Sequence, residues 1–201
     1  AVTSDLLAGT AYDPTTRAEL LQIVEDEAER LDRLVANLLS LSRIETGSLH
    51  PKRQAVDLDE LVRERVQAMS RLFHQVRLVI DVPGDLPLVD GDYTLLDQLI
   101  TNLLENAARH APPRSTVTVA ARPAGTGDVR LAVSDEGIGI PDHERHRLFE
   151  PFRRGEGSRS SGVGLAICKA VAEAHGGTVA VERTPGGGAT FVATLPVREA
   201  R

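Results

Sequence analysis

A repeating apolar pattern between Pro14 and Gly47 constrains the fold more than any other feature of the sequence. Apolar residues recur there at alternating steps of three and four, at Leu21, Val24, Ala28, Leu31, Val35 and Leu38. This spacing predicts one long helix with an apolar seam, beginning at Asp13-Pro14 and ending at Thr46-Gly47, where capping residues stand. The seam is wider than a two-stranded coiled coil requires, because it also includes Leu20, Leu34 and Leu41. The pattern favours a helix of a bundle, with packing onto the chain's own domain as the alternative.

The rest of the chain alternates predicted helices and strands. A polar connection at 48–56 precedes a second amphipathic helix at 58–73, where we expect a new domain to begin. Two more helices are expected at 92–109 and 165–175, with Asp92 as the cap of the first and Gly176-Gly177 as the end of the second. Predicted strands cover 78–82, 86–89, 116–121, 129–133, 178–182 and 189–195, with a turn-rich segment at 123–128. The alternation predicts an α/β sandwich with one mixed sheet.

Composition excludes several classes of protein. Hydrophobic residues make up 41% and charged residues 26% of the chain, which fits a globular protein and not a disordered or fibrous one. The net charge of −6, with no Lys/Arg-rich face, argues against nucleic acid as a partner. The single cysteine, Cys168, rules out an intramolecular disulfide and is expected to be buried in a helix. No apolar run reaches the roughly 18–20 residues of a membrane span, so we expect a cytoplasmic location without membrane contact.

Two asparagines in the predicted helix at 92–109 form the first candidate site. Asn102 and Asn106 lie four residues apart and Arg109 follows three later, so the three project from nearly one face of the helix. Asn is a mediocre helix former, so the pair calls for an explanation, although a solvated polar face is the alternative. An amide oxygen is a good ligand for Mg²⁺ when phosphates supply the negative charge, and a guanidinium suits phosphate oxygens.

Two glycine-containing segments are further candidates. Asp135-Glu-Gly-Ile-Gly-Ile-Pro141 follows a predicted strand, so its glycines let the backbone approach a flat ligand; a plain strand-to-helix turn is the alternative. Ser161-Gly-Val-Gly-Leu165 precedes a helix, whose N-terminus favours phosphate. It is neither a Walker A loop nor a dinucleotide fingerprint, because the required Lys and third Gly are missing. The polar, basic segment at 153–161 has the composition of a mobile flap, or of an ordinary surface loop.

In their order and spacing, these segments resemble the nucleotide-binding boxes of the GHKL superfamily, which includes gyrase, Hsp90, MutL and histidine kinases. Residues 102–110 resemble the N box, 135–141 the first glycine box, 148–152 the F box, 162–165 the second glycine box and 186–191 the last one. The F box and residues 166–177 are typical of histidine kinases within the superfamily. The helix that ends at Gly47 is similar to the second helix of their dimerisation and phosphotransfer domain.

The resemblance implies a fold and a set of partners. It implies a Bergerat-type two-layer α/β sandwich with a mixed sheet at 57–198, a linker at 48–56, and part of the dimerisation and phosphotransfer region at 1–47. ATP and Mg²⁺ would be the cofactors. The intact protein would be a homodimeric, membrane-bound sensor that phosphorylates itself and then a response regulator. Residues 11–16 and the helix after them are most similar to the potassium-responsive Kdp sensor kinases.

The resemblance also implies roles for individual residues. Asn106 would bind Mg²⁺ and Asn102 would lie beside the phosphates, and Asn102, Glu105 and Arg109 are the catalytic candidates. Asp135 would accept a hydrogen bond from the adenine amino group, and the segment at 153–161 would form the ATP lid. The other nucleotide-binding candidates are Arg109, His110, Gly137, Gly139, Ile140, Phe149, Phe152, Ser161, Gly162, Val163, Gly164, Leu165 and Thr190.

The phosphoacceptor motif of sensor kinases, His-Asp/Glu-x-x-Thr-Pro, does not occur around any of the six histidines. His143-Glu144 is the only His-acid pair, and Arg145-His-Arg147 follows it. We therefore expect the acceptor to lie upstream of Ala1, and this chain alone not to autophosphorylate. The resemblance predicts the ATP-binding catalytic region of a protein-histidine kinase; another GHKL ATPase, an anti-sigma-type serine kinase and a non-catalytic scaffold are the alternatives.

Overall fold

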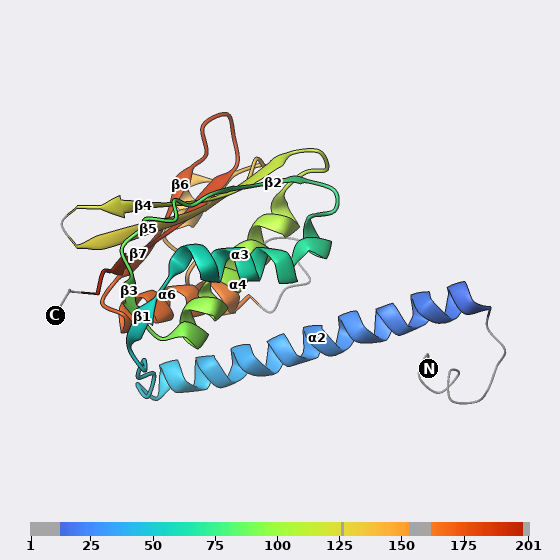
Figure 1. Cartoon of the computed structure of the whole chain (residues 1–201), viewed down its shortest axis with the longest axis horizontal. Coiled ribbons are helices and arrows are strands. Elements are labelled where there is room, and N and C mark those ends of the chain that lie inside the picture. Colours follow the sequence, from blue (N-terminus) through green and yellow to red (C-terminus); the bar gives the residue numbers. More distant parts are fainter. Residues whose placement is uncertain (1–12, 126, 153–161, 199–201) are drawn as a thin grey trace.

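The computed structural model describes residues 13–125, 127–152 and 162–198, which form a long helix and an α/β domain (Figure 1). The long helix is α2 (Pro14–Glu45), and the Asp13 carboxylate caps it by accepting hydrogen bonds from the N–H groups of Thr15 and Thr16. Gly47, with a φ of 64°, follows its C-terminal end. Both predicted ends of this helix are confirmed, because each depends on residues next to it in the sequence.

The domain is built on a five-stranded mixed sheet in the order β2-β4-β5-β7-β6. The strands are β2 (Arg77–Asp81), β4 (Thr116–Ala124), β5 (Asp128–Ser134), β6 (Thr178–Arg183) and β7 (Ala189–Pro196). Strands β2 and β4 are parallel, whereas the other neighbouring pairs are antiparallel. One face of the sheet is covered by α3 (Leu58–Ala68), α4 (Tyr93–His110) and α6 (Gly164–Ala174) (Figure 1). The predicted two-layer α/β fold with a mixed sheet is confirmed.

The core lies between the sheet and these helices. Leucine, isoleucine and valine fill most of it, in keeping with the scarcity of aromatic residues. Its fully buried members include Leu96, Leu99, Ile100, Leu103, Val117, Val119, Val129, Leu131, Ile167 and Leu195. Each such side chain stabilises the fold by about 1.5–3 kcal/mol relative to an exposed one. Cys168 is also completely buried in α6, as predicted, and burial raises the pKa of its thiol.

Three segments differ from the sequence-based expectations. The helix expected at 58–73 ends at Ala68, and a 3₁₀-helix, η1 (Ser70–Phe73), follows Met69. The strand expected at 86–89 is instead β3 (Val89–Gly91), which pairs with β1 (Gln54–Val56) inside the expected polar connection. Strand β4 extends through the first two residues of the expected turn at 123–128. A three-residue strand has too few side chains to produce a detectable alternation, which is why β1 was missed.

Most of the apolar stripe of α2 is exposed; the C-terminal part of the helix packs on the domain, and Glu25 of its first half forms an exposed ion pair with Arg71 of η1 at 3.6 Å. Leu21, Leu31, Val35 and Leu38 are 52–57% exposed, whereas Leu41 is buried. Near this end, Gln98 of α4 accepts a hydrogen bond from Ser40 Oγ at 3.0 Å and donates one to Asn37 Oδ1 at 3.1 Å. The alternative considered from the sequence, in which α2 packs on its own domain, therefore describes the apolar side chains of its C-terminal turns and not those of the rest of the helix. Within the described residues, no helix has the length and apolar character needed to cross a membrane.

Candidate functional site

Helices α4 and α6 are antiparallel neighbours and carry most of the candidate residues. Midway along them, the Cys168 thiol donates to the carbonyl of Leu99 at 3.6 Å. At the N-terminus of α6, Gly164 lies against Asn102, because a Cβ at Gly164 would be 3.1 Å from Asn102 Oδ1. Any larger residue at position 164 would displace this amide. The packing thus brings the N box and the second glycine box together, although 62 positions separate Asn102 from Gly164.

Asn102 is the buried polar residue of this junction. Its side chain is 7% exposed, and its Nδ2 atom is buried without a hydrogen-bond partner among the described residues. Leaving a buried donor unsatisfied costs about 1–3 kcal/mol, and few buried side-chain polar atoms in proteins remain so. The two N–H groups of this amide therefore have no acceptor among the described residues, and its Oδ1 lies next to the start of α6.

The start of α6 provides further donors. Gly162, with a φ of 71°, turns the chain into the helix, and the side chain of Val163 is buried in the core. No side chain of the described residues caps this end, and the N–H of Ile167 donates to the carbonyl of Val163 at 3.0 Å. The N–H groups of the first turn of a helix, together with the positive end of its dipole, favour an anionic ligand.

The other polar residues of α4 become more exposed toward its C-terminus. Glu105 and Asn106 are half-buried, whereas Arg109 and His110 are exposed. Although His110 as a whole is exposed, its imidazole is partly shielded from water by its neighbours. This desolvation, and then the charge of Arg109, lower the pKa of His110, so this ring is neutral at pH 7. Exposure therefore rises from Asn102 to Arg109, as expected for side chains on one face of a helix that leaves the core.

Asp135 begins the loop after β5 and is 2% exposed. Its Oδ1 accepts a hydrogen bond from the N–H of Gly137 at 2.8 Å, and its own N–H donates to the carbonyl of Ala189 at 2.9 Å. No described residue donates to Oδ2. This buried carboxylate therefore keeps one oxygen free to accept a hydrogen bond from a ligand.

Two glycine segments pack closely against the backbone around Asp135: the one that follows it in the chain, with Gly137 and Gly139, and the β6–β7 turn, with Gly188. A Cβ at Gly137 would lie 2.6 Å from the carbonyl oxygen of His110, at the end of α4. A Cβ at Gly188 would lie 1.9 Å from the carbonyl oxygen of Asp135, and one at Gly139 would lie 3.0 Å from the carbonyl oxygen of Gly188. These contacts hold the loop around Asp135 against the end of α4 and the β6–β7 turn, so its shape depends on residues far apart in the sequence.

The two phenylalanines of the F box lie in different environments. Phe149 is half-buried and packs edge-on against Phe191 of β7, with ring centroids 6.4 Å apart and an interplanar angle of 84°. Phe152 is 61% exposed and has a φ of 62°, in the left-handed region. Of the two F-box phenylalanines, Phe149 thus packs against the core and Phe152 is presented to solvent.

The remaining candidates are placed as follows. Ile140 and Leu165 are half-buried and pack against the core. The hydroxyl of Thr190 donates to Ser134 Oγ at 2.9 Å and lies 3.0 Å from Thr184 Oγ1, so it is engaged within the sheet. Ser161 and the predicted lid at 153–161 lie outside the described residues.

Two polar residues on the helices that carry this site were not identified from the sequence. Gln98 lies on the helix that carries Asn102 and contacts α2. Its position four residues before Asn102, which places it on the same face of the helix, was the available signal in the sequence. His175 is completely buried at the C-terminal end of α6, although the sequence showed only that it precedes two glycines. Gln98 bonds to residues 58 and 61 positions away, and His175 accepts from Asp92, 83 positions away, so no local pattern indicated these contacts.

Residues 91–199 match the family model of histidine kinase-, DNA gyrase B- and HSP90-like ATPases. The sensor-like histidine kinase SenX3 of Mycobacterium tuberculosis is 38% identical over 205 residues, covering 98% of this chain and 49% of SenX3. The chain therefore spans about half the length of SenX3. The sensor protein KdpD of Clostridium acetobutylicum is 33% identical over 193 residues, covering 94% of this chain and 21% of KdpD. The similarity to Kdp sensors is thus not greater than that to SenX3, and the Kdp subfamily stays a prediction.

Solved structures of sensor kinases are similar as well. The mycobacterial sensor histidine kinase MprB superposes with a TM-score of 0.66 at 31% identity, covering 74% of this chain and 99% of the MprB chain. Full-length ShkA in complex with AMPPNP superposes with a TM-score of 0.77 at 27% identity, covering 99% of this chain and 43% of ShkA. The similarity to ShkA thus extends over α2 as well as the α/β domain.

Proposed function

This chain belongs to the histidine kinase-, DNA gyrase B- and HSP90-like ATPases, in their sensor histidine kinase branch, and we propose that residues 57–198 bind Mg²⁺-ATP where α4 meets α6. The observation that carries this proposal is the Asn102 amide, whose buried Nδ2 has no partner among the described residues and whose Oδ1 lies against the start of α6, where no described side chain acts as a cap. A phosphate oxygen at this junction would satisfy both sets of donors.

The adenine end of the nucleotide is proposed to lie against the loop after β5. The free Oδ2 of Asp135 accepts a hydrogen bond from the adenine amino group, while Gly137 and Gly139 allow the loop that carries Asp135 to pack closely on the backbone of His110 and Gly188. Asp135 and Asn102 lie at opposite ends of the C-terminal half of α4, because Gly137 contacts His110 and Gly164 contacts Asn102. One nucleotide would thus extend along this half of the helix, with its phosphates toward α6.

The residues also fit a magnesium ion that is held jointly with phosphates. Among the described residues, no group of three or more His, Cys, Asp or Glu side chains could hold a metal by itself. The Asn106 amide oxygen would therefore act as the protein ligand, with phosphate oxygens and water as the others. The ion would neutralise charge on the phosphates. The chain's own contribution is to orient them, through Asn102, Arg109 and the first turn of α6.

In the intact protein, we propose that this domain phosphorylates a histidine whose phosphoryl group then passes to an Asp of a response regulator. The names of SenX3 and MprB as histidine kinases support this activity. We further propose that α2 belongs to a dimerisation and phosphotransfer region formed by residues 1–47. Its exposed apolar residues, Leu21, Leu31, Val35 and Leu38, support a helical bundle between two copies, since such a stripe requires a partner.

Nucleotide titration tests the site itself. We expect ATP or ADP to bind in a Mg²⁺-dependent manner with a micromolar Kd, at about −5.5 to −8 kcal/mol. Asp135→Asn should weaken binding by about 1–3 kcal/mol, because an amide N–H would face the adenine amino group in place of a free acceptor. Isothermal titration calorimetry measures both, and Asp128→Asn, at the exposed opposite end of β5, is the matched control. Equal affinity of the Asp135 variant would remove Asp135 from the adenine role, and no binding by the wild type would favour a non-catalytic scaffold.

Phosphoryl transfer from labelled ATP tests the division of roles. None of the six histidines has the acceptor setting, so the chain alone should form no acid-labile phosphohistidine. Addition of a two-helix phosphotransfer domain that carries the acceptor histidine should lead to slow, Mg²⁺-dependent labelling of that domain. Label on any histidine of this chain alone would contradict the absence of an acceptor. Failure to label the added domain, with ATP binding established, would contradict the kinase activity.

A further inference from the structure

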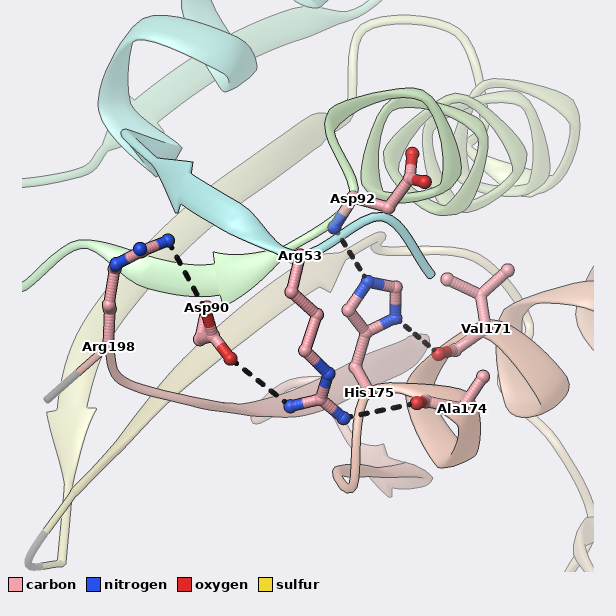
Figure 2. A network of polar contacts seen from close by, with 7 residues as sticks. All are labelled: Arg53, Asp90, Asp92, Val171, Ala174, His175 and Arg198. Carbon is pink, nitrogen blue, oxygen red and sulfur yellow. Dashed lines mark hydrogen bonds and ion pairs between the residues drawn. The ribbon is translucent and has the colours of Figure 1, made fainter. Parts of the chain in front are cut away.

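His175 is completely buried and joins the ends of α6 and α4 (Figure 2). Its Nδ1 lies 2.7 Å from the carbonyl oxygen of Val171, one turn back in α6. Its Nε2 accepts a hydrogen bond from the backbone N–H of Asp92 at 2.9 Å. Asp92 is the N-cap of α4, so a single imidazole connects the last turn of one helix to the first residue of the other.

These two partners determine the protonation state of the imidazole. The Val171 carbonyl can only accept, so Nδ1 must carry a proton, whereas the Asp92 N–H can only donate, so Nε2 must be free of one. Burial is the main cause that lowers the pKa of His175, and the charge of Arg53 lowers it further; the hydrogen bond to the Val171 carbonyl and the charges of Asp92 and Asp90 oppose this shift. The neutral Nδ1–H tautomer is therefore the form that fits at pH 7.

The surroundings of His175 leave it little freedom. A Cβ at Gly91 would lie 3.2 Å from its Cδ2 atom, so the ring packs directly on the backbone of β3. Arg53 donates to the carbonyl of Ala174 at 3.3 Å and pairs with Asp90 at 3.3 Å, and Arg198 approaches the same carboxylate at 3.5 Å (Figure 2). These contacts connect the start of β1, the strand β3 and the C-terminal segment to one another and to the end of α6.

The position of this bond relates it to the proposed nucleotide site. Along the antiparallel pair of helices, His175 meets Asp92 at one end, Cys168 meets Leu99 in the middle, and Gly164 meets Asn102 at the other end. An α-helix is nearly rigid along its axis, at 1.5 Å per residue. A shift of α6 along α4 at the His175 end would therefore move Gly164, and the first-turn N–H groups, relative to Asn102.

We propose that His175 is a positioning residue for the nucleotide site: its hydrogen bond to the N–H of Asp92 sets the axial offset of α6 against α4. This inference rests on the proposed binding of nucleotide where α4 meets α6. His175 does not touch the ligand and acts through the two helices. If His175 served only to stabilise the fold, the loss of either hydrogen bond would have a similar effect on nucleotide binding. A positioning role predicts instead that only the loss of the bond to Asp92 weakens binding.

Two substitutions separate these bonds. In His175→Asn, the amide nitrogen takes the place of Nδ1, so the bond within α6 is kept and the bond to α4 is lost. In His175→Gln, the amide oxygen takes the place of Nε2, so the bond to Asp92 is kept and the bond to Val171 is lost. Each variant loses one hydrogen bond, and thermal unfolding of both should show similarly lowered Tm values.

The measurement is the Kd for Mg²⁺-ADP of the full chain, by calorimetry, at a temperature where all variants are folded. We expect His175→Asn to bind at least tenfold more weakly than the wild type and His175→Gln to bind within about threefold of it, since 1.4 kcal/mol corresponds to a factor of ten. In ¹⁵N-labelled protein without nucleotide, the side-chain amide signals of Asn102 should move in the Asn variant and stay in place in the Gln variant.

The possible outcomes are distinct. Equal affinities of the wild type and His175→Asn would overturn the positioning role while leaving the nucleotide site intact. Parallel losses in both variants, in step with their Tm values, would also overturn it and assign His175 to folding alone. A wild type that binds no nucleotide would overturn the proposed function itself, and with it this inference.

Discussion

Asn106→Ala is expected to slow phosphoryl transfer to an added phosphotransfer domain by on the order of 10²–10³-fold, the range seen when one group that stabilises transition-state charge is removed. The amide of Asn106 is the only protein ligand that we propose for Mg²⁺, and no group of acidic residues, histidines or cysteines in the described chain could replace it. Loss of the ligand would leave the phosphates with less charge compensation and a less defined orientation.

Binding provides a readout for Asn106 that does not depend on transfer. The affinity of the wild type for ADP should fall when EDTA removes Mg²⁺, whereas that of Asn106→Ala should be weak under both conditions. Gln67→Ala, which removes an exposed amide from α3, is the matched control and should change neither rate nor affinity. An Asn106 variant that transfers at the wild-type rate, or keeps the full Mg²⁺ dependence of binding, would exclude Asn106 as the metal ligand.

Gly188→Ala is expected to lower the free energy of unfolding by about 2–5 kcal/mol and to abolish nucleotide binding. Its φ is 94°, and an added Cβ would lie 1.9 Å from the carbonyl oxygen of Asp135. The left-handed conformation costs an alanine about 1–2 kcal/mol, and relief of the collision costs about 1–3 kcal/mol more. Because the obstructing atom belongs to the backbone of Asp135, the loop that carries the proposed adenine contact must move.

Gly186→Ala separates the two contributions. Gly186 lies in the same turn with a φ of 91°, but a Cβ there would have no atom within 4 Å. This control should therefore show only the conformational cost, about 1–2 kcal/mol, and should keep its affinity for ADP. Urea unfolding and calorimetry measure the two effects. Equal losses of stability in both variants would show that contact with Asp135 does not matter, and retained ADP binding by Gly188→Ala would separate this turn from the nucleotide site.

The sequence alone determined the features that depend on neighbouring residues. The ends of α2 and the start of α4 were predicted correctly, because Asp13 and Asp92 cap N–H groups two and three positions away. The glycines after β5 and before α6 were recognisable for the same reason, as short patterns of fixed spacing. The order of these patterns along the chain was sufficient to predict the family and the α/β fold.

Tertiary structure decided how these segments meet. Gly188 contacts Asp135 and Asp92 donates to His175, and the residues of each pair are at least 53 positions apart in the chain. The buried, unsatisfied amide of Asn102 likewise results from the packing of distant segments. The same holds for β1, which exists because β3 lies beside it, and for Gln98, whose partners are on α2. The backbone geometry of a few consecutive residues determines helix caps and turns. The long-range contacts depend instead on how whole helices and strands pack against a common core.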